Sequence, residues 1–212
     1  MNSDLIIGAA QKTIAVEIQT LEDLKQSIDE SFVKIVQLIY SSKGRLVVTG
    51  IGKSALVAKK IVATLNSTGT PSLFMHAADA IHGDLGMISA QDIVLCISKS
   101  GETPEIKVLI PLARNLGSAI IGMASNPKST LGQQADYFLH TPIRQEADPN
   151  NLAPTASTTA QMALGDAIAI ALLNMRGFTD KDFAKYHPGG ALGKRLYNQP
   201  FINDLKKSSV LG

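Results

Sequence analysis

The sequence predicts an α/β protein with a doubly wound, five-stranded parallel sheet of flavodoxin-like type and helical extensions at both ends. Short apolar runs alternate with helical segments between residues 45 and 177, and these runs are nearly continuous in Val, Ile and Leu. Such runs are typical of parallel strands that are covered on both faces. Alternating strands and helices give a doubly wound sheet, which binds ligands at the carboxyl ends of its strands.

We expect the elements in the following order. Apolar residues at spacings of three and four predict one amphipathic helix from about 20 to 40. Apolar runs predict strands at 45–50, 72–75, 92–98, 119–124 and 137–141. Helical patterns between and after them predict helices at 54–65, 104–115 and 155–175, and a short helix that begins near 179.

The composition indicates one folded domain. The chain has 212 residues, of which 45% are hydrophobic and 18% charged. This length suits one substantial core. We therefore expect a single domain over 1–212, with N-terminal helices over 1–41, an α/β core over 42–177 and a C-terminal segment over 178–212. Cys96, the single cysteine, lies in an apolar run and is expected to be buried, which excludes a disulfide scaffold.

Charge and hydropathy exclude further classes of protein. The net charge of +2 argues against a nucleic-acid binder, which would carry a strongly basic face. The N-terminal sequence shows no signal peptide, and no run of eighteen apolar residues is present. We therefore expect a cytoplasmic protein without nucleic-acid or membrane partners.

The segment VVTGIGKS, at Val47–Ser54, resembles a phosphate-binding loop. A nucleoside-triphosphate loop requires glycine at position 47, where this chain has valine. The dinucleotide fingerprint G-x-G-x-x-A is satisfied at 50–55, but the second strand runs into His76 instead of an acid that could bind a ribose. A dinucleotide-dependent oxidoreductase remains a less favoured alternative.

A second anion-binding signal follows the third predicted strand, in SKSGETP. Ser98, Ser100 and Thr103 supply hydroxyl groups, Pro104 suits the first position of a helix, and Thr103 suits its N-cap. Hydroxyls and free N–H groups at a helix N-terminus form a cradle for one phosphate. An ordinary strand–helix turn is the alternative explanation.

A further hydroxyl cluster, PTASTT, opens the long helix at 154–159. Ser157 and Thr158 could contact sugar hydroxyls or help to hold the phosphate. Taken alone, this cluster would be explained as helix capping.

Six segments together carry a resemblance to a known family. They are GIGKS, STGTPS, HAADAIHGDLGMI, SKSGETPE, NLAPTASTTAQMALGDAIA and HPGGALGKRL, between about Gly44 and Leu196. In these segments the chain resembles the arabinose-5-phosphate isomerases of the sugar isomerase (SIS) domain superfamily. The resemblance implies interconversion of D-ribulose 5-phosphate and D-arabinose 5-phosphate without a cofactor, feeding Kdo synthesis for lipopolysaccharide or capsule.

The resemblance implies four catalytic residues, which are Lys53, Glu105, Glu146 and His187. Aldose–ketose isomerisation through an enediolate needs a base, a group that stabilises the oxyanion and an acid/base for ring opening. We expect Glu146 to be the base, His187 to open the ring or shuttle protons, and Lys53 to stabilise charge. Glu105 would orient Lys53 or share the proton relay. By sequence alone, a carboxylate at a helix start is explained equally well by the helix dipole.

The resemblance also implies substrate contacts from Gly69, Thr70, His76 and His82. A turn before the second strand would explain Gly69 and Thr70 equally well. His76 could bind an inhibitory metal ion. We expect no required metal, because His76 and His82 do not share a helical face and a zinc site needs more converging ligands.

Two features differ from many members of the family. Many relatives continue into a tandem of regulatory CBS modules, and we expect a short form without CBS domains because the sequence ends at Gly212. Lys99 stands between two serines where relatives often have asparagine. This extra cation could favour a more anionic ligand, such as the nucleotide sugar CMP-Kdo acting as a feedback ligand.

The resemblance further implies assembly, since SIS subunits typically form tetramers with sites at their interfaces. We expect a homotetramer in which His187 or His82 reaches the pocket of a neighbouring subunit. A non-catalytic sugar-phosphate-binding SIS module remains the alternative from another functional class, because such a module needs the phosphate loop but not the catalytic carboxylates and histidine.

Overall fold

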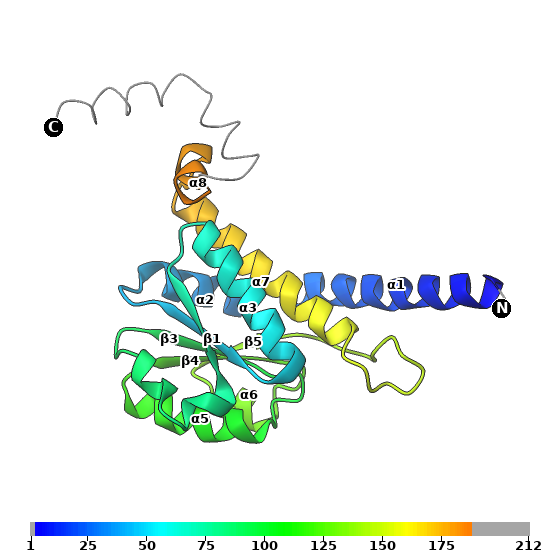
Figure 1. Cartoon of the computed structure of the whole chain (residues 1–212), viewed down its shortest axis with the longest axis horizontal. Coiled ribbons are helices and arrows are strands. Elements are labelled where there is room, and N and C mark those ends of the chain that lie inside the picture. Colours follow the sequence, from blue (N-terminus) through cyan, green and yellow to red (C-terminus); the bar gives the residue numbers. More distant parts are fainter. Residues whose placement is uncertain (1–2, 188–212) are drawn as a thin grey trace.

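Five apolar runs form one all-parallel sheet in the order β2-β1-β3-β4-β5 in the computed structural model, which describes residues 3–187 (Figure 1). The strands are β1 (Leu46–Gly50), β2 (Ser72–His76), β3 (Ile93–Ile97), β4 (Ala119–Ala124) and β5 (Tyr137–His140). Every residue of β1 and β3 is buried, as expected for strands covered on both faces. The predicted fold class is confirmed.

The helices cover both faces of the sheet (Figure 1). They are α1 (Ser3–Gln26), α2 (Glu30–Ser41), α3 (Gly52–Ser67), α4 (Ala77–Ala80), α5 (Pro104–Asn115), α6 (Thr130–Gln134), α7 (Ala156–Met175) and α8 (Asp180–Tyr186), with a 3₁₀ turn, η1 (Asp84–Met87). Helices α2, α3 and α7 pack on one face, and α4, α5 and α6 pack on the other. The short α4, η1 and α6 were not predicted.

Successive strand residues point to opposite faces, so the sheet separates two apolar cores. Val48 and Leu95 belong to the core under α3 and α7, whereas Val47 and Cys96 belong to the core under α5. Complete burial raises the pKa of the Cys96 thiol to about 12. Cys96 is therefore a small buried hydrophobe, as predicted.

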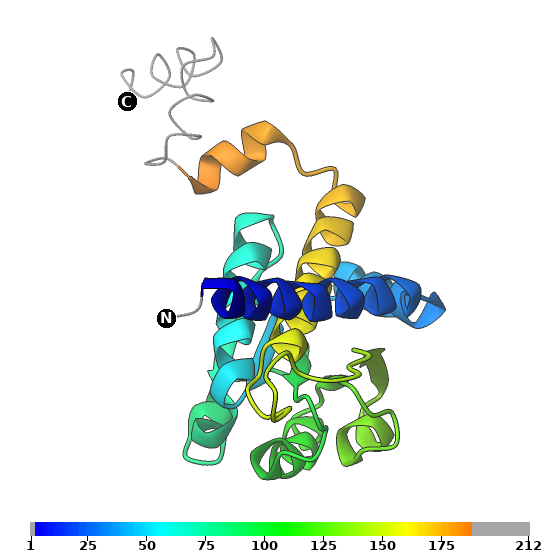
Figure 2. The ribbon, with the colours of Figure 1, turned by 90° about the vertical axis from the view of Figure 1, so that its right-hand side faces the viewer.

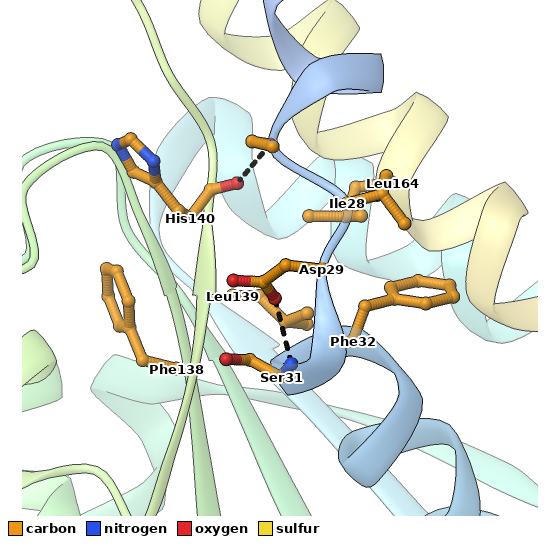
Figure 3. A pocket seen from close by; sticks show the side chains of 9 residues that line it. Ile28, Asp29, Ser31, Phe32, Phe138, Leu139, His140 and Leu164 are labelled. Carbon is orange, nitrogen blue, oxygen red and sulfur yellow. Dashed lines mark hydrogen bonds between the residues drawn. The ribbon is translucent and has the colours of Figure 1, made fainter.

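The predicted continuous helix from 20 to 40 is wrong, because the chain turns between α1 and α2. The carboxylate of Asp29 accepts a hydrogen bond from the N–H of Ser31 at 2.8 Å and caps α2. The hydroxyl of Ser27 donates to the carbonyl of Leu24 at 2.8 Å and helps to end α1. Figure 3 shows this turn beside β5. The apolar spacing continues across the turn, which is why the pattern resembled one helix.

Helix α1 leaves much of its apolar surface uncovered. It extends from the body of the molecule (Figures 1 and 2), and Thr20 and Leu24 are its buried residues. Large apolar side chains stay exposed along it, namely Leu5, Ile6, Ile7, Ile14 and Ile18. Within the described residues, the outer part of α1 therefore exposes apolar side chains that few other residues cover.

Helix α7 packs against α1, α2 and α3. Gly165 permits close contact with α3, because a Cβ atom there would collide with the side chain of Ile61. Within residues 3–187, α7 is the one helix long and apolar enough to cross a membrane by length and composition, but half of that span is buried inside the fold. Its packing is that of a core helix.

Candidate active site

A cavity of about 240 Å³ opens at the carboxyl edge of the sheet, where the loops after β1 and β3 meet the start of α7. Six of the predicted site residues line it: Lys53, Ser98, Ser100, Thr103, Ser157 and Thr158. Lys99, Ser54 and Pro154 also contribute to its wall. The structure thus brings together three segments that lie far apart in the sequence. We call this cavity the phosphate pocket.

The loop after β3, residues 98–103, which we call the phosphate loop, is tightly held. The hydroxyl oxygens of Ser98 and Thr103 lie 2.7 Å apart, and the N–H of Gly101 donates to Ser98 Oγ at 3.0 Å. Gly101 has a φ of +72°, and a Cβ atom there would also collide with Ser129. Glycine is therefore required at this turn of the loop.

Thr103 does occupy the N-cap position of α5, as predicted, but its side chain does not cap the helix. Its hydroxyl pairs with Ser98 instead. Pro104 stands at the start of the helix, also as predicted. The first turn of α5 therefore has N–H groups that the Thr103 side chain leaves available to an anion.

Three helices begin around the phosphate pocket. Lys53 lies in the first turn of α3, Thr103 precedes α5, and Ser157 lies in the first turn of α7. Helix N-termini carry partial positive charge and favour anions. Lys53 and Lys99 add two formal positive charges to a wall that includes no acidic residue among the described lining residues. The arrangement suits a phosphate group.

Glu146 lies buried behind this wall, at the start of α7. Its Oε2 accepts hydrogen bonds from the N–H of Thr155 at 2.9 Å, the hydroxyl of Thr155 at 3.2 Å and the N–H of Ser157 at 3.1 Å. Its Oε1 is 2.9 Å from Nζ of Lys99. The carboxylate therefore joins the start of α7 to the phosphate loop.

The surroundings of Glu146 keep it ionised. Burial raises its pKa, but hydrogen bonds from Ser157 and Lys99 and from the backbone at Thr155 outweigh burial and hold the pKa at about 2. The side chain of Glu146 is 0% exposed, whereas that of Lys99 is 40% exposed. Glu146 is thus a buried anion whose neutralising cation faces the pocket.

The loop that carries Glu146 is shaped by its own side chains. Asn151 has a φ of +56°, which asparagine tolerates better than most residues, and its side chain accepts a hydrogen bond from the N–H of Glu146 at 2.6 Å. The carboxylate of Asp148 accepts from the N–H groups of Leu152 and Ala153, each at 2.8 Å. These residues position Glu146, and they were not predicted from the sequence. The run DPNN was the available signal, since Asp and Asn shape turns in this way.

Gln161 was also missed. It is buried beside the pocket, and its side-chain oxygen accepts a hydrogen bond from Ser54 at 3.2 Å. This contact ties the start of α3 to α7 next to Lys53. A glutamine inside an apolar helix was the available signal, because buried polar groups are usually hydrogen-bonded.

Glu105, His76 and His82 lie outside the described lining of the pocket. Glu105 is partly buried in the first turn of α5. His76 ends β2, and its Nδ1 lies 3.7 Å from Asp79 Oδ2, while His82 is exposed beyond α4. Within residues 3–187, no three His, Cys, Asp or Glu side chains gather as metal ligands would. Metal binding at His76 remains a prediction.

A model of the SIS domain family matches residues 38–171, which is more than half of the chain. The chain belongs to the SIS domain family. The matched region begins in α2 and ends inside α7, so it contains the whole sheet and the phosphate pocket.

Two curated relatives of this SIS domain are named as isomerases. The chain is 54% identical over 190 residues to "Arabinose 5-phosphate isomerase KdsD" of Pseudomonas aeruginosa, covering 90% of this chain and 58% of that protein. It is 48% identical over 192 residues to "Arabinose 5-phosphate isomerase KpsF" of Escherichia coli O6:H1, covering 90% and 59%. The chain therefore spans less than two thirds of the length of these curated relatives.

A solved structure of an Escherichia coli CFT073 protein in complex with arabinose 5-phosphate has the same fold. It is 38% identical in sequence, with a TM-score of 0.86, and the alignment covers 89% of this chain and 100% of that chain. A second, described as "a putative sugar-phosphate isomerase" from Listeria monocytogenes, is 36% identical with a TM-score of 0.86 and covers 89% and 100%.

Three predicted site residues of this SIS domain lie away from the pocket of their own chain. Two of them are Gly69, which packs against the ring of Phe178, and Thr70, whose hydroxyl accepts a hydrogen bond from Arg176 at 3.3 Å. Phe178 and Arg176 follow the last residue of α7, whereas Ser157 of the pocket lies in the first turn of α7. The twenty residues of α7 separate the two ends by about 30 Å.

His187, the third, lies at the same far end. It follows α8, its ring stacks on Phe183 with a centroid distance of 3.9 Å, and its Nδ1 lies 2.9 Å from the carbonyl oxygen of Phe183. The rest of the HPGGALG segment falls outside the described residues. Within one chain the structure therefore does not bring His187, Gly69 or Thr70 to Lys53. Their substrate contacts remain predictions that require a second copy of the chain.

A second cavity of the SIS domain, of about 180 Å³, lies between the α1–α2 turn and β5 (Figure 3). Its polar groups serve the fold. Asp29 caps α2, and the carbonyl of His140 accepts a hydrogen bond from Ser27 at 3.4 Å. The ring Nε2 of His140 lies 3.1 Å from the carbonyl oxygen of Ser125. We assign no ligand to this cavity.

Proposed function

We propose that this protein is an aldose–ketose isomerase that interconverts D-ribulose 5-phosphate and D-arabinose 5-phosphate and so supplies Kdo synthesis. The phosphate pocket carries the proposal, because Lys53 and the hydroxyls of the 98–103 loop line it and the buried anion Glu146 is paired with Lys99 in its wall. The names of the relatives and the sugar phosphate named in the similar structure support the same activity.

We propose the following roles. The loop hydroxyls and the N-termini of α5 and α7 would hold the phosphate, so that the sugar carbons extend along the pocket toward Lys53. A base takes a proton from C1 of the ketose, and the electron pair forms the C1–C2 double bond of an enediolate. The ammonium group of Lys53 stabilises the negative oxygen. The hydroxyl proton of O1 passes to O2, and the carbon proton is returned at C2 to give the aldose. Glu146 is the proposed base.

We assign the remaining roles to residues outside the pocket of one chain. His187 would serve ring opening or proton shuttling from a neighbouring subunit, and Glu105 would orient Lys53 or share the proton relay. Gly69, Thr70, His76 and His82 would complete the substrate site in the assembled protein. The distance of about 30 Å along α7 supports this arrangement, because His187 cannot reach the pocket of its own chain.

A homotetramer is the proposed assembly. The uncovered apolar side chains of α1 support it, since a large exposed apolar surface marks an interaction site. The proposed compartment is the cytoplasm, because charged sugar phosphates do not partition into a bilayer. CMP-Kdo is the proposed feedback ligand, since Lys53 and Lys99 offer two cations to its phosphodiester and carboxylate groups.

The decisive experiment supplies the purified protein with D-ribulose 5-phosphate in the presence of a chelator and identifies the product by NMR. The proposal expects D-arabinose 5-phosphate to form without added metal or nucleotide. A Ser41→Ala protein, altered at an exposed hydroxyl of α2 remote from the phosphate loop, serves as a matched control. No turnover, or a different product, would contradict the proposal.

A non-catalytic sugar-phosphate-binding module is the second candidate. The position of His187 and Glu105 outside the pocket of one chain favours it, because a binding module would need neither residue there. Binding of D-arabinose 5-phosphate without turnover would support this candidate. A dinucleotide-dependent enzyme is disfavoured, because β2 ends at His76 and not at an acidic residue that could bind a ribose.

A further inference from the structure

Lys99 occupies the middle of the phosphate loop, and its side chain crosses to a different loop. Its Nζ lies 2.9 Å from Oε1 of Glu146. Its main chain is held in place, because its carbonyl oxygen accepts hydrogen bonds from the N–H and hydroxyl of Ser125 at 2.9 and 2.7 Å. A change of partner at Lys99 would therefore involve the side chain and leave the loop in place.

The two oxygens of Glu146 have different surroundings. Oε2 is held by Thr155 and Ser157 at the start of α7. Oε1 faces the ammonium group of Lys99, which also lines the pocket. Because Glu146 is fully buried and Lys99 is 40% exposed, the cation stands between the buried carboxylate and the space that a ligand would enter.

We propose that Lys99 exchanges partners when a phosphate monoester enters the pocket, so that its ammonium group leaves Oε1 of Glu146 and pairs with the phosphate. This inference rests on the proposed isomerase function and adds a residue to it. Oε1 then becomes free to accept the proton from C1 of the ketose, and it returns that proton at C2. Glu146 ends the turnover as a carboxylate, and Lys99 keeps its proton throughout.

The exchange solves a chemical difficulty at Glu146. A carboxylate with a pKa of about 2 is a weak base at neutral pH, and the hydrogen bond from Lys99 contributes to this low value. A phosphate dianion competes well for an ammonium group, and the flexible lysine stem allows the movement. Among the described residues that line the pocket, the charged groups are Lys99 from the loop after β3 and Lys53 from α3, so removal of one cation leaves the other.

The test compares Lys99→Met with Lys60→Met and uses inorganic phosphate as the probe. Lys60 is a matched control. It also forms an ion pair, with Asp166, and its side chain is 42% exposed. It does not line the pocket. Calorimetry measures phosphate binding. Carbon-13 NMR at pH 8, where inorganic phosphate is largely a dianion, follows the chemical shift of the Glu146 carboxyl, with Glu146→Gln to assign its signal.

In the natural protein and in Lys60→Met, we expect phosphate to shift the carboxyl signal of Glu146, because Lys99 leaves Oε1. In Lys99→Met, we expect that signal to be shifted already and to change little with phosphate, and we expect phosphate to bind about tenfold more weakly because one charge-assisted hydrogen bond is lost. Lys99→Arg should restore the binding, which shows that any loss in Lys99→Met reflects charge rather than misfolding.

Two outcomes would overturn the exchange. Phosphate could bind to the natural protein without shifting the carboxyl signal of Glu146, or it could shift that signal equally in Lys99→Met. Neither measurement depends on turnover. A protein that shows the exchange but no isomerisation would therefore refute the proposed function, whereas an active isomerase without the exchange would refute the role of Lys99.

Discussion

The hydroxyl oxygens of Ser98 and Thr103 lie 2.7 Å apart and share a hydrogen bond across the phosphate loop. Ser98 is buried and also accepts the N–H of Gly101, so the pair closes the loop before any ligand arrives. The substrate phosphate would meet a loop whose shape is already set, which reduces the ordering cost of binding.

Ser98→Ala should therefore weaken substrate binding more than it slows chemistry. Loss of the hydroxyl removes one contact to a charged group and the bond to Gly101, and it should raise KM about tenfold or more. Steady-state kinetics with D-ribulose 5-phosphate would measure this effect. Ser41→Ala is the control, since its exposed hydroxyl bonds only within α2. A lowered kcat at unchanged KM would contradict a binding role for Ser98.

Glu146→Gln should lower kcat by a factor of about 100 to 10,000, the usual contribution of a general base. The amide keeps the size of the side chain but cannot accept the substrate proton. Glu30→Gln is the matched control, because Glu30 is an exposed glutamate in the first turn of α2 and belongs to neither the 98–103 loop nor the loop that carries Glu146. Activity within threefold of the natural protein in Glu146→Gln would exclude Glu146 as the base.

Asp92 should make the stability of the fold sensitive to acid. Its side chain is 1% exposed and pairs with Arg45 at 2.9 Å. Burial raises the pKa of Asp92, but hydrogen bonds from Arg45 and Ser89 outweigh burial and lower the pKa from 3.8 to about 2. A group whose pKa is lowered on folding stabilises the fold at pH values above its pKa in the unfolded chain. For Asp92 this stabilisation is lost as the pH falls from about 4 to about 2.

Asp92→Asn should therefore lower the free energy of unfolding at pH 7 by about 2 kcal/mol, given about 1.4 kcal/mol for each unit of pKa. Urea denaturation at pH 7 and pH 3 would measure this. The difference in the free energy of unfolding between the natural protein and Asp92→Asn should be smaller at pH 3, because the aspartate then begins to gain a proton. An equal difference at both pH values would show that the charge of Asp92 is not its source.

Gly165→Val should destabilise the packing of α7 on α3. The new side chain would collide with Ile61, and overpacking of this kind typically costs about 1–3 kcal/mol. Gly8→Ala is the matched control, because a Cβ atom there meets no other atom within 4 Å and alanine favours the helix. Thermal unfolding should show a lower Tm for Gly165→Val and an equal or higher Tm for Gly8→Ala. The opposite order would contradict the close packing of α3 and α7.

The fold was largely predictable because its signals are local. The apolar runs predicted all five strands to within two residues, and Pro104 and Gly117 marked the limits of α5. The turn at Asp29 was missed, since the apolar spacing continues through it and a capping carboxylate resembles any helix-surface acid. The short α4 and α6 contain too few residues to show a helical period.

The site was only partly predictable, because its decisive contacts join distant segments. The hydroxyls of the 98–103 loop follow a strand and indicate a phosphate loop, so Ser98 and Thr103 could be named from sequence. The contact between Lys99 and Glu146 could not be predicted, since nothing in either local sequence specifies a partner on another loop. The hydrogen bond between Ser54 and Gln161 could not be predicted for the same reason.

The most direct test of the central claim mixes two inactive proteins, Lys53→Ala and His187→Ala, under conditions that exchange subunits. If His187 completes the pocket of a neighbouring chain, sites that combine an intact Lys53 with an intact His187 should form, and activity should recover to as much as about a quarter of the natural level. Activity that stays at the level of the separate variants after verified exchange would contradict a site shared between subunits.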